Sequence, residues 1–114
     1  MNYIEILAKE IRLERDSRRT EADPRNMKAR DRLKKDKLYR IYAVLALAKG
    51  LSLSIEDVHN AFVAWLADWC NTAPCCVPFA ELPEAAQEKD ALYLDVILTV
   101  LKGKTHASDK TPHL

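Results

Sequence analysis

Three cysteines have the most conspicuous side-chain chemistry in this chain of 114 residues. Cys70, Cys75 and Cys76 follow a C-x4-C-C spacing, and His59 lies eleven residues before Cys70. A structural zinc site needs four ligands, usually in two close pairs such as C-x-x-C, and adjacent cysteines rarely chelate one ion well. An odd, crowded set is also a poor disulfide framework. The spacing therefore predicts free thiols in a reducing cytoplasm, with no metal ion and no other cofactor.

Residues suited to acid–base catalysis are few. Glu88 and Asp90 are two positions apart, so on a helix they do not face each other. His59 is the one histidine in the region that we expect to fold, because His106 and His113 lie near the C-terminus. A lone helical histidine is more often a structural residue than a general base. We expect a protein without enzymatic activity, and the weakest alternative is a small cyclic-nucleotide hydrolase with His59 as general base.

Aromatic side chains gather in the sequence within and on both sides of the segment 71–80. Such rings stack on nucleobases, and each stacked base contributes about 1–3 kcal/mol. The alternative is a hydrophobic core built from large rings, which is the stronger interpretation for the two aromatic residues in the middle of the preceding helix. The full set is Phe62, Trp65, Trp69, Phe79 and Tyr93.

A basic segment covers residues 25–40, with eight Lys and Arg side chains against Asp31 and Asp36. Such a segment can hold phosphate groups through charge-assisted hydrogen bonds, or bind nucleic acid. It can also be a solvated helix face. The charge is uneven over the whole chain, with net +6 in residues 1–50 and net −5 in residues 51–114. This division favours self-association or an anionic partner for the basic half.

Hydrophobic periodicity predicts about four helices. The first covers residues 3–19, and the second runs from Pro24 to Lys49 and ends at Gly50, a favourable residue just after a helix. The third begins at Ser54, whose side chain can cap it, with Asp57 in its first turn. A loop with two prolines follows at 71–80.

The fourth helix is predicted from Pro83 to Gly103, and residues 104–114 are predicted to form a disordered tail. With only two glycines, a β-rich fold with many tight turns is disfavoured. No apolar run is long enough to span a membrane, and the N-terminus lacks the pattern of a signal peptide. We therefore expect an all-α protein, a small bundle of about four helices forming a single domain over residues 1–103.

Residues 58–98 resemble the ryanodine-receptor (RyR) repeat domain. That motif joins a helix with a His-acidic-x-Trp core, a Pro-Tyr-x-x-Leu element and a helix that opens with Glu-Lys-x-x-Asp. The corresponding segments here are 58–62 (VHNAF), 77–83 (VPFAELP) and 88–90 (EKD), followed by Tyr93. The departures are Asn60 for an acid, Phe62 for Trp, Phe79 for Tyr and a shorter spacing before Asp90. Residues 38–50 are similar to small bacteriophage proteins of unknown function.

The resemblance implies an RyR-like C-terminal half and non-catalytic recognition of a small anionic, nucleotide-like ligand. In a bacteriophage protein this would sequester an immune nucleotide signal in the host cytoplasm. A homodimer is expected, because so small a chain has few walls to enclose a ligand. In the expected site, Trp69, Phe79 and Tyr93 stack on the ligand, Arg40 and Lys89 pair with phosphate, and His59 orients the ligand. The alternative is a factor that binds a protein, or less readily a nucleic acid, through the basic helix 24–40.

Overall fold

The computed structural model describes residues 2–18, 29–68, 70 and 72–110, and within these ranges it contains four α-helices, two short 3-10 turns and no strand. The prediction of a small all-α bundle is confirmed. Helix α1 spans Tyr3–Ser17, and helix α2 spans Ala29–Lys49. The predicted start of the second helix at Pro24 lies outside the described residues. Among the described helices, none is both long and apolar enough to cross a membrane.

Local capping sets several helix ends. The side chain of Asn2 accepts a hydrogen bond from the backbone N–H of Glu5 and so caps α1. Gly50 follows α2 with a φ of 58°, a left-handed conformation that glycine adopts without steric cost. It begins the 3-10 turn η1, Gly50–Ser52. The predicted end of the second helix is therefore confirmed.

Helix α3, Ile55–Ala67, begins with the predicted cap. Ser54 accepts a hydrogen bond from the backbone N–H of Asp57, and Asp57 accepts one in return from the backbone N–H of Ser54. The bond from the Ser54 backbone is the main cause that lowers the pKa of Asp57. This arrangement satisfies backbone donors that the first turn of a helix leaves unpaired.

Helix α4 spans Glu84–Lys110 and follows the 3-10 turn η2, Phe79–Glu81. It continues through Gly103, so the predicted end of the helix there is wrong. A glycine inside a helix costs only about 1 kcal/mol relative to alanine, and it ends a helix when its backbone turns left-handed, which Gly103 does not. Residues 104–110, which the sequence assigned to a disordered tail, belong to α4. Residues 111–114 lie outside the described residues.

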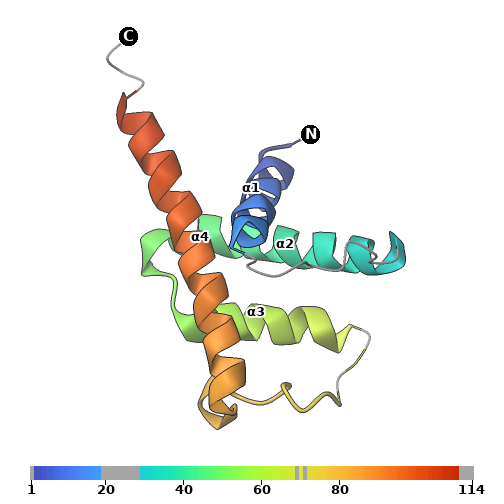
Figure 1. Ribbon diagram of the computed structural model, residues 1–114. Helices are drawn as coiled ribbons and strands as arrows, with labels where there is room; N and C mark the ends of the chain where they lie inside the picture. The colour runs from blue at the N-terminus through green and yellow to red at the C-terminus, as the bar shows by residue number, and fades with distance from the viewer. Residues whose placement is uncertain (1, 19–28, 69, 71, 111–114) are drawn as a thin grey trace.

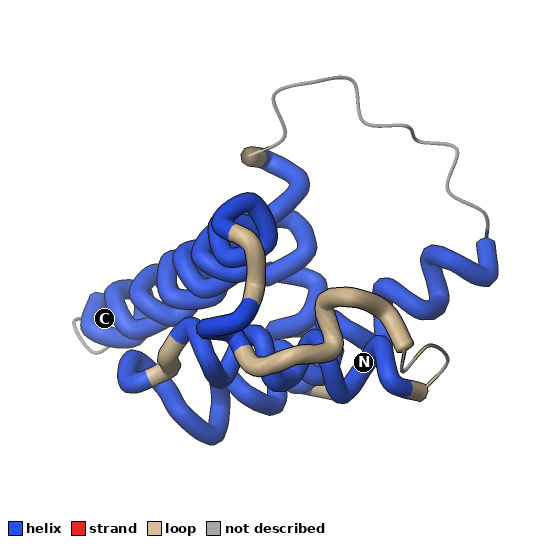
Figure 2. Tube along the Cα trace, turned by 90° about the horizontal axis from the view of Figure 1, so that it is seen from below, coloured by secondary structure: helices blue, strands red, loops and turns tan. Residues whose placement is uncertain are grey.

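The helices cross rather than align. In Figure 1, α2 and α3 lie one above the other, α1 packs on the α2 side, and α4 crosses both α2 and α3. The connection between α3 and α4, tan in Figure 2, passes along the α3 side of the bundle. The two sides of the molecule therefore differ: α1 and α2 form one of them, and α3 with the α3–α4 connection forms the other.

Buried side chains from all four helices form one core. The completely buried residues include Ile11 of α1, Leu38 and Tyr42 of α2, Val58 of α3 and Ile97 of α4. Burial of an aliphatic side chain of this size contributes about 1.5–3 kcal/mol, so these contacts hold the helices together. Leu7 of α1, Trp65 of α3 and Val96 of α4 belong to the same core.

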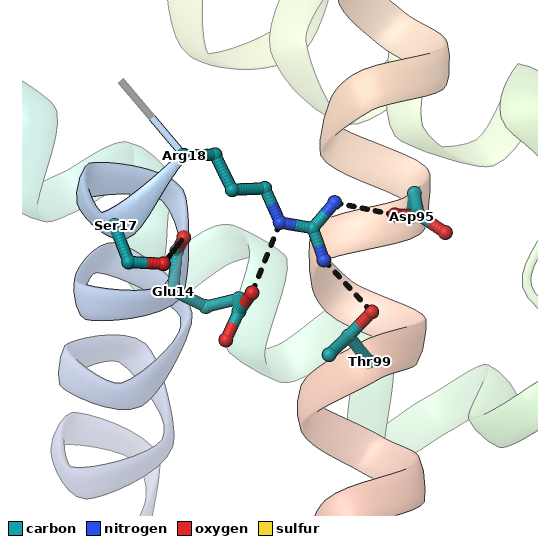
Figure 3. A network of polar contacts seen from close by, with 5 residues as sticks. All are labelled: Glu14, Ser17, Arg18, Asp95 and Thr99. Carbon is teal, nitrogen blue, oxygen red and sulfur yellow. Dashed lines mark hydrogen bonds and ion pairs between the residues drawn. The ribbon is translucent and has the colours of Figure 1, made fainter. Parts of the chain in front are cut away.

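Arg18, just after α1, ties this helix to α4 (Figure 3). Its guanidinium donates hydrogen bonds to the carboxylate of Asp95 and to the hydroxyl of Thr99, the latter at 2.9 Å. A third bond joins Arg18 to Glu14 at 2.9 Å. The hydrogen bonds to Asp95 and Glu14 raise the pKa of Arg18. The contact lies near the surface, where an ion pair contributes up to about 1 kcal/mol.

Candidate functional site

A pocket of about 180 Å³ opens between α1 and α2. Its cations come from both helices: Lys9 and Arg12 lie one turn apart on α1, and Arg40 lies on α2. Lys9 and Arg40 are exposed, and Arg12 is half-buried. The complete lining is Glu5, Ala8, Lys9, Arg12, Asp36, Tyr39 and Arg40.

The pocket has a net charge of +1, from three cations and the carboxylates of Glu5 and Asp36. Within the part of the chain that the structure describes, none of the three cations forms an ion pair. Their charge is thus not neutralised by direct contact with a carboxylate. Three such groups around a small concave surface can donate hydrogen bonds to the oxygens of one anionic group.

Tyr39 and Ala8 form the apolar part of the lining. Tyr39 is only 4% exposed, and its ring packs at 6.3 Å from Tyr42 and 6.4 Å from Tyr93, between ring centres. Burial is the main cause that raises the pKa of Tyr39 far above its ordinary value. Its phenol is therefore neutral at physiological pH and adds no negative charge to the pocket.

His59 lies inside the protein, away from this pocket. It is 1% exposed, and both ring nitrogens have partners: Nδ1 is 2.9 Å from Oδ2 of Asp90, and Nε2 is 2.5 Å from the backbone oxygen of Val77. Helix α3 supplies the imidazole, α4 supplies the carboxylate, and the α3–α4 connection supplies the carbonyl. The histidine therefore joins three segments of the chain, and in this conformation neither nitrogen faces solvent.

The hydrogen-bond partners of His59 indicate how many protons His59 and Asp90 hold together. A carbonyl oxygen only accepts, so Nε2 donates to Val77. One further proton lies between Nδ1 and Asp90, which makes the pair neutral overall. Burial raises the pKa of Asp90, and the charge and hydrogen bond of His59 oppose that rise. Such a closed, neutral pair is suited to holding segments together.

Two of the aromatic candidates pack against protein groups. Phe79 is half-buried and meets the His59 ring edge-on, with 6.2 Å between ring centres. Tyr93 is also half-buried; its ring lies 5.3 Å from that of Tyr42, and the guanidinium of Arg15 lies 5.5 Å from its centre. The Tyr93 ring is thus part of an aromatic cluster beneath Arg15.

The remaining candidates occupy different places. Arg40 lines the pocket between α1 and α2. Lys89 is exposed in the second turn of α4, the end of that helix beside the α3–α4 connection (Figure 1). Trp69 lies outside the described residues. Of the six predicted residues, the structure brings His59 and Phe79 into contact, and it does not place Lys89 in the pocket that contains Arg40.

The cysteines are all free thiols of intermediate exposure, as the sequence predicts. The Sγ of Cys76 lies 3.8 Å from the backbone oxygen of Cys70. Burial is the main cause that raises the pKa of Cys75, so its thiol is protonated at physiological pH. In the described ranges, no group of three or more His, Cys, Asp or Glu side chains could hold a metal ion.

Only Arg40 of the seven lining residues was predicted from the sequence, and the other two cations of the pocket, Lys9 and Arg12, were not. The available signal was their position: they lie outside the stripe of Ile4, Leu7 and Ile11 that enters the core, on the edge that faces Asp36 and Arg40. The pattern alone does not tell which neighbouring helix lies beside that edge. Only the packing of α1 on α2 identifies these cations as neighbours of Arg40.

The fold and the pocket define a small all-α domain with a cationic surface site and a buried histidine–aspartate pair. The chain belongs to the DUF7701 family: the model of this domain of unknown function matches residues 2–102. No curated protein and no solved structure matches the chain. The matched range contains α1, α2, α3 and most of α4, so the family pattern includes both sides of the pocket.

Proposed function

We propose that this protein binds a small anionic, nucleotide-like ligand without transforming it, through the pocket between α1 and α2. The observation that carries this proposal is the convergence of Lys9, Arg12 and Arg40 on one small concavity with no ion pair among the described residues to neutralise them. Guanidinium groups present several donors in a fixed plane, which suits the oxygens of a phosphate group.

The dimensions of the pocket indicate which part of the ligand it holds. Ligand pockets for whole drug-sized molecules measure about 300–1,000 Å³, so a space of about 180 Å³ accommodates one anionic group rather than a complete nucleotide. The remainder of the ligand would lie over the exposed surface beside Arg40.

The finer expectations from the sequence remain hypotheses about the ligand. The resemblance to RyR repeats implies recognition of a nucleotide-like ligand, but it covers residues 58–98, which do not line this pocket. In a bacteriophage protein, such recognition would sequester a host immune nucleotide. The contacts of the pocket support an anionic group as the common element of these ideas. In this proposal, Arg40 keeps the role that the sequence suggested, and Lys9 and Arg12 take the phosphate-pairing role given to Lys89.

A thermal-shift screen tests the proposed function. The purified protein is melted with phosphate, pyrophosphate and a set of linear and cyclic nucleotides at equal ionic strength. A ligand at 100 times its dissociation constant adds about 2.7 kcal/mol of stability, which raises the melting temperature of a domain of this size by several degrees. The proposal predicts such a rise for at least one phosphate compound. If none of them raises the melting temperature at millimolar concentration, the proposal fails.

A further inference from the structure

One face of α2 is exposed over about four helical turns. It carries Leu33, Lys37, Arg40, Val44 and Leu47, all of them exposed. The three aliphatic residues are among the most exposed large hydrophobic side chains of the described protein, at 63% for Leu33 and 51% for Val44 and Leu47. They lie opposite Tyr42 and Ala46, which enter the core on the other side of the same helix. We call these five exposed residues the outer face of α2.

The spacing along the outer face is four, three, four and three residues. This alternation is the a and d pattern by which one α-helix packs along another. Scattered single hydrophobic residues on a surface need no explanation. On this face, Val44 and Leu47 lie one turn apart and Leu33 lies beyond Lys37 and Arg40, so apolar and cationic positions share one row. Helix α2 therefore has one apolar face for its own core and a second face with the spacing that suits another helix.

Charge indicates the chemistry of that other helix. The two central positions of the outer face are Lys37 and Arg40, and neither forms an ion pair within the described residues. Lys9 and Arg12 lie beside Arg40 across the pocket and add to the positive potential. A helix packed here with apolar residues opposite these cations would leave their charges partly desolvated and unpaired. Carboxylates at the same places would pair with them.

We propose that the outer face of α2 docks an amphipathic α-helix of a partner protein, with aliphatic residues at both ends of its contact and Asp or Glu opposite Lys37 and Arg40. This is helix-on-helix recognition, in which the aliphatic contacts supply affinity and the charges supply register and choice of partner. It is separate from anion binding in the pocket, because Leu33, Val44 and Leu47 do not line the pocket.

A second copy of this chain fits the face less well. A two-fold antiparallel pairing of the outer face with itself, centred at Arg40, would place Arg40 opposite its own copy and Lys37 of each copy one turn away. Four cations would then approach each other with no carboxylate on the outer face to compensate them. Nucleic acid is also disfavoured, because the aliphatic residues at both ends of the face would meet phosphates or solvent.

The test uses two synthetic helical peptides as probes. Both carry leucine at the outer a and d positions; one has Glu and the other Lys at the two central positions, and a scrambled acidic peptide is the control. Fluorescence anisotropy measures their binding. We expect the acidic peptide to bind at least about tenfold more tightly than the basic one, a difference of about 1.4 kcal/mol. The scrambled peptide should bind no better than the basic one.

Variants assign the binding to the outer face. Leu47→Asp should abolish binding of the acidic peptide and leave the circular dichroism spectrum and the anion-induced thermal shift unchanged. The double variant Lys37→Glu, Arg40→Glu should reverse the preference between the peptides. The proposal is overturned if the wild type does not bind the acidic peptide or binds the scrambled one equally. It is also overturned if sedimentation shows a dimer that Leu47→Asp dissociates, since a second copy then covers this face.

Discussion

His59 and Asp90 form a buried pair, with 2.9 Å between Nδ1 and Oδ2, that joins α3 to the first turns of α4. The same imidazole donates to the backbone oxygen of Val77 and so holds the α3–α4 connection against the bundle. The connection also packs on the core through Leu82 and the partly buried Ala73 and Cys75, and the histidine with two partners adds a polar restraint to these contacts. The pair is therefore a structural device of the domain.

Removing one member of this pair should be costly. His59→Ala or Asp90→Ala leaves the other buried polar group without its partner, and loss of one partner from a buried pair costs about 3–5 kcal/mol. Urea unfolding measures this free energy. The double variant His59→Leu, Asp90→Leu should cost less than the two single losses added together, because it leaves no unpaired charge. If each single variant lowers the free energy of unfolding by less than about 1 kcal/mol, His59 and Asp90 are not a buried, hydrogen-bonded pair.

Substitution of Tyr42 by phenylalanine at neutral pH should not lower the free energy of unfolding, in contrast to the loss of His59 or Asp90. The phenolic oxygen of Tyr42 is buried and has no hydrogen-bond partner among the described residues, so Tyr42→Phe removes an unsatisfied group and should keep or increase the stability. A loss above about 2 kcal/mol on this substitution would mean that the hydroxyl has a partner, such as an internal water molecule.

Tyr42 also predicts a loss of stability in alkali. Burial is the main cause that raises its pKa well above the ordinary value near 10. Because the folded pKa is the higher one, the contribution to stability is complete below pH 10 and is lost as the pH rises through the folded value. Unfolding curves between pH 9 and 11 should show a loss of up to about 1.4 kcal/mol per pH unit for this phenol. Tyr42→Phe should reduce the slope, whereas Tyr3→Phe, at a 69% exposed position, should not.

Trp65 anchors the basic half of α2 on α3. The residue is 6% exposed, its Nε1 donates to the backbone oxygen of Lys34 at 2.7 Å, and the ammonium of Lys35 lies 5.6 Å from the ring centre. Trp65→Ala should cost about 3–5 kcal/mol, and Trp65→Phe less, measured by urea unfolding. An unchanged melting temperature in Trp65→Ala would show that the ring is exposed, and would make it a candidate for ligand stacking.

Metal ions and disulfides should not contribute to stability. The three cysteines are free, and the described residues contain no group that could hold a metal ion. Addition of EDTA or of a thiol reductant should leave the melting temperature unchanged. A clear fall with EDTA, reversed by zinc, would contradict this and would direct attention to the segment Cys70–Cys76.

Much of the fold follows from local sequence signals. Ser54 and Asp57 identify the start of α3, and Gly50 identifies the end of α2, because each of these residues acts through its own backbone and nearest neighbours. The predicted helix end at Gly103 was wrong, because the presence of a glycine does not reveal whether its backbone is helical. The free state of the cysteines also followed from their number and spacing.

The site was harder to predict, because it depends on contacts between distant segments. The partner of His59 is 31 residues away in the sequence, and Asp90 gave no signal of its burial. The role of Tyr93 could not be predicted either. An aromatic residue on a helix packs on other rings or on a ligand, and the sequence does not show which of these faces it. Arg40 was recognised from charge, whereas Lys9 and Arg12 became candidates only through the packing of α1 on α2.

Isothermal titration calorimetry of pyrophosphate into the wild type and matched charge-removing variants tests most directly whether the pocket binds an anion. We predict binding to the wild type that weakens with salt, and at least a tenfold loss of affinity in Arg12→Gln and in Arg40→Gln. Lys102→Gln, which removes an exposed cation elsewhere on α4, is the control and should bind as the wild type does. Lys89→Gln should also bind normally, because Lys89 does not line the pocket. Equal affinity in the wild type, Arg12→Gln and Arg40→Gln, or loss of binding only in Lys89→Gln, would contradict the assignment of the pocket as the anion site.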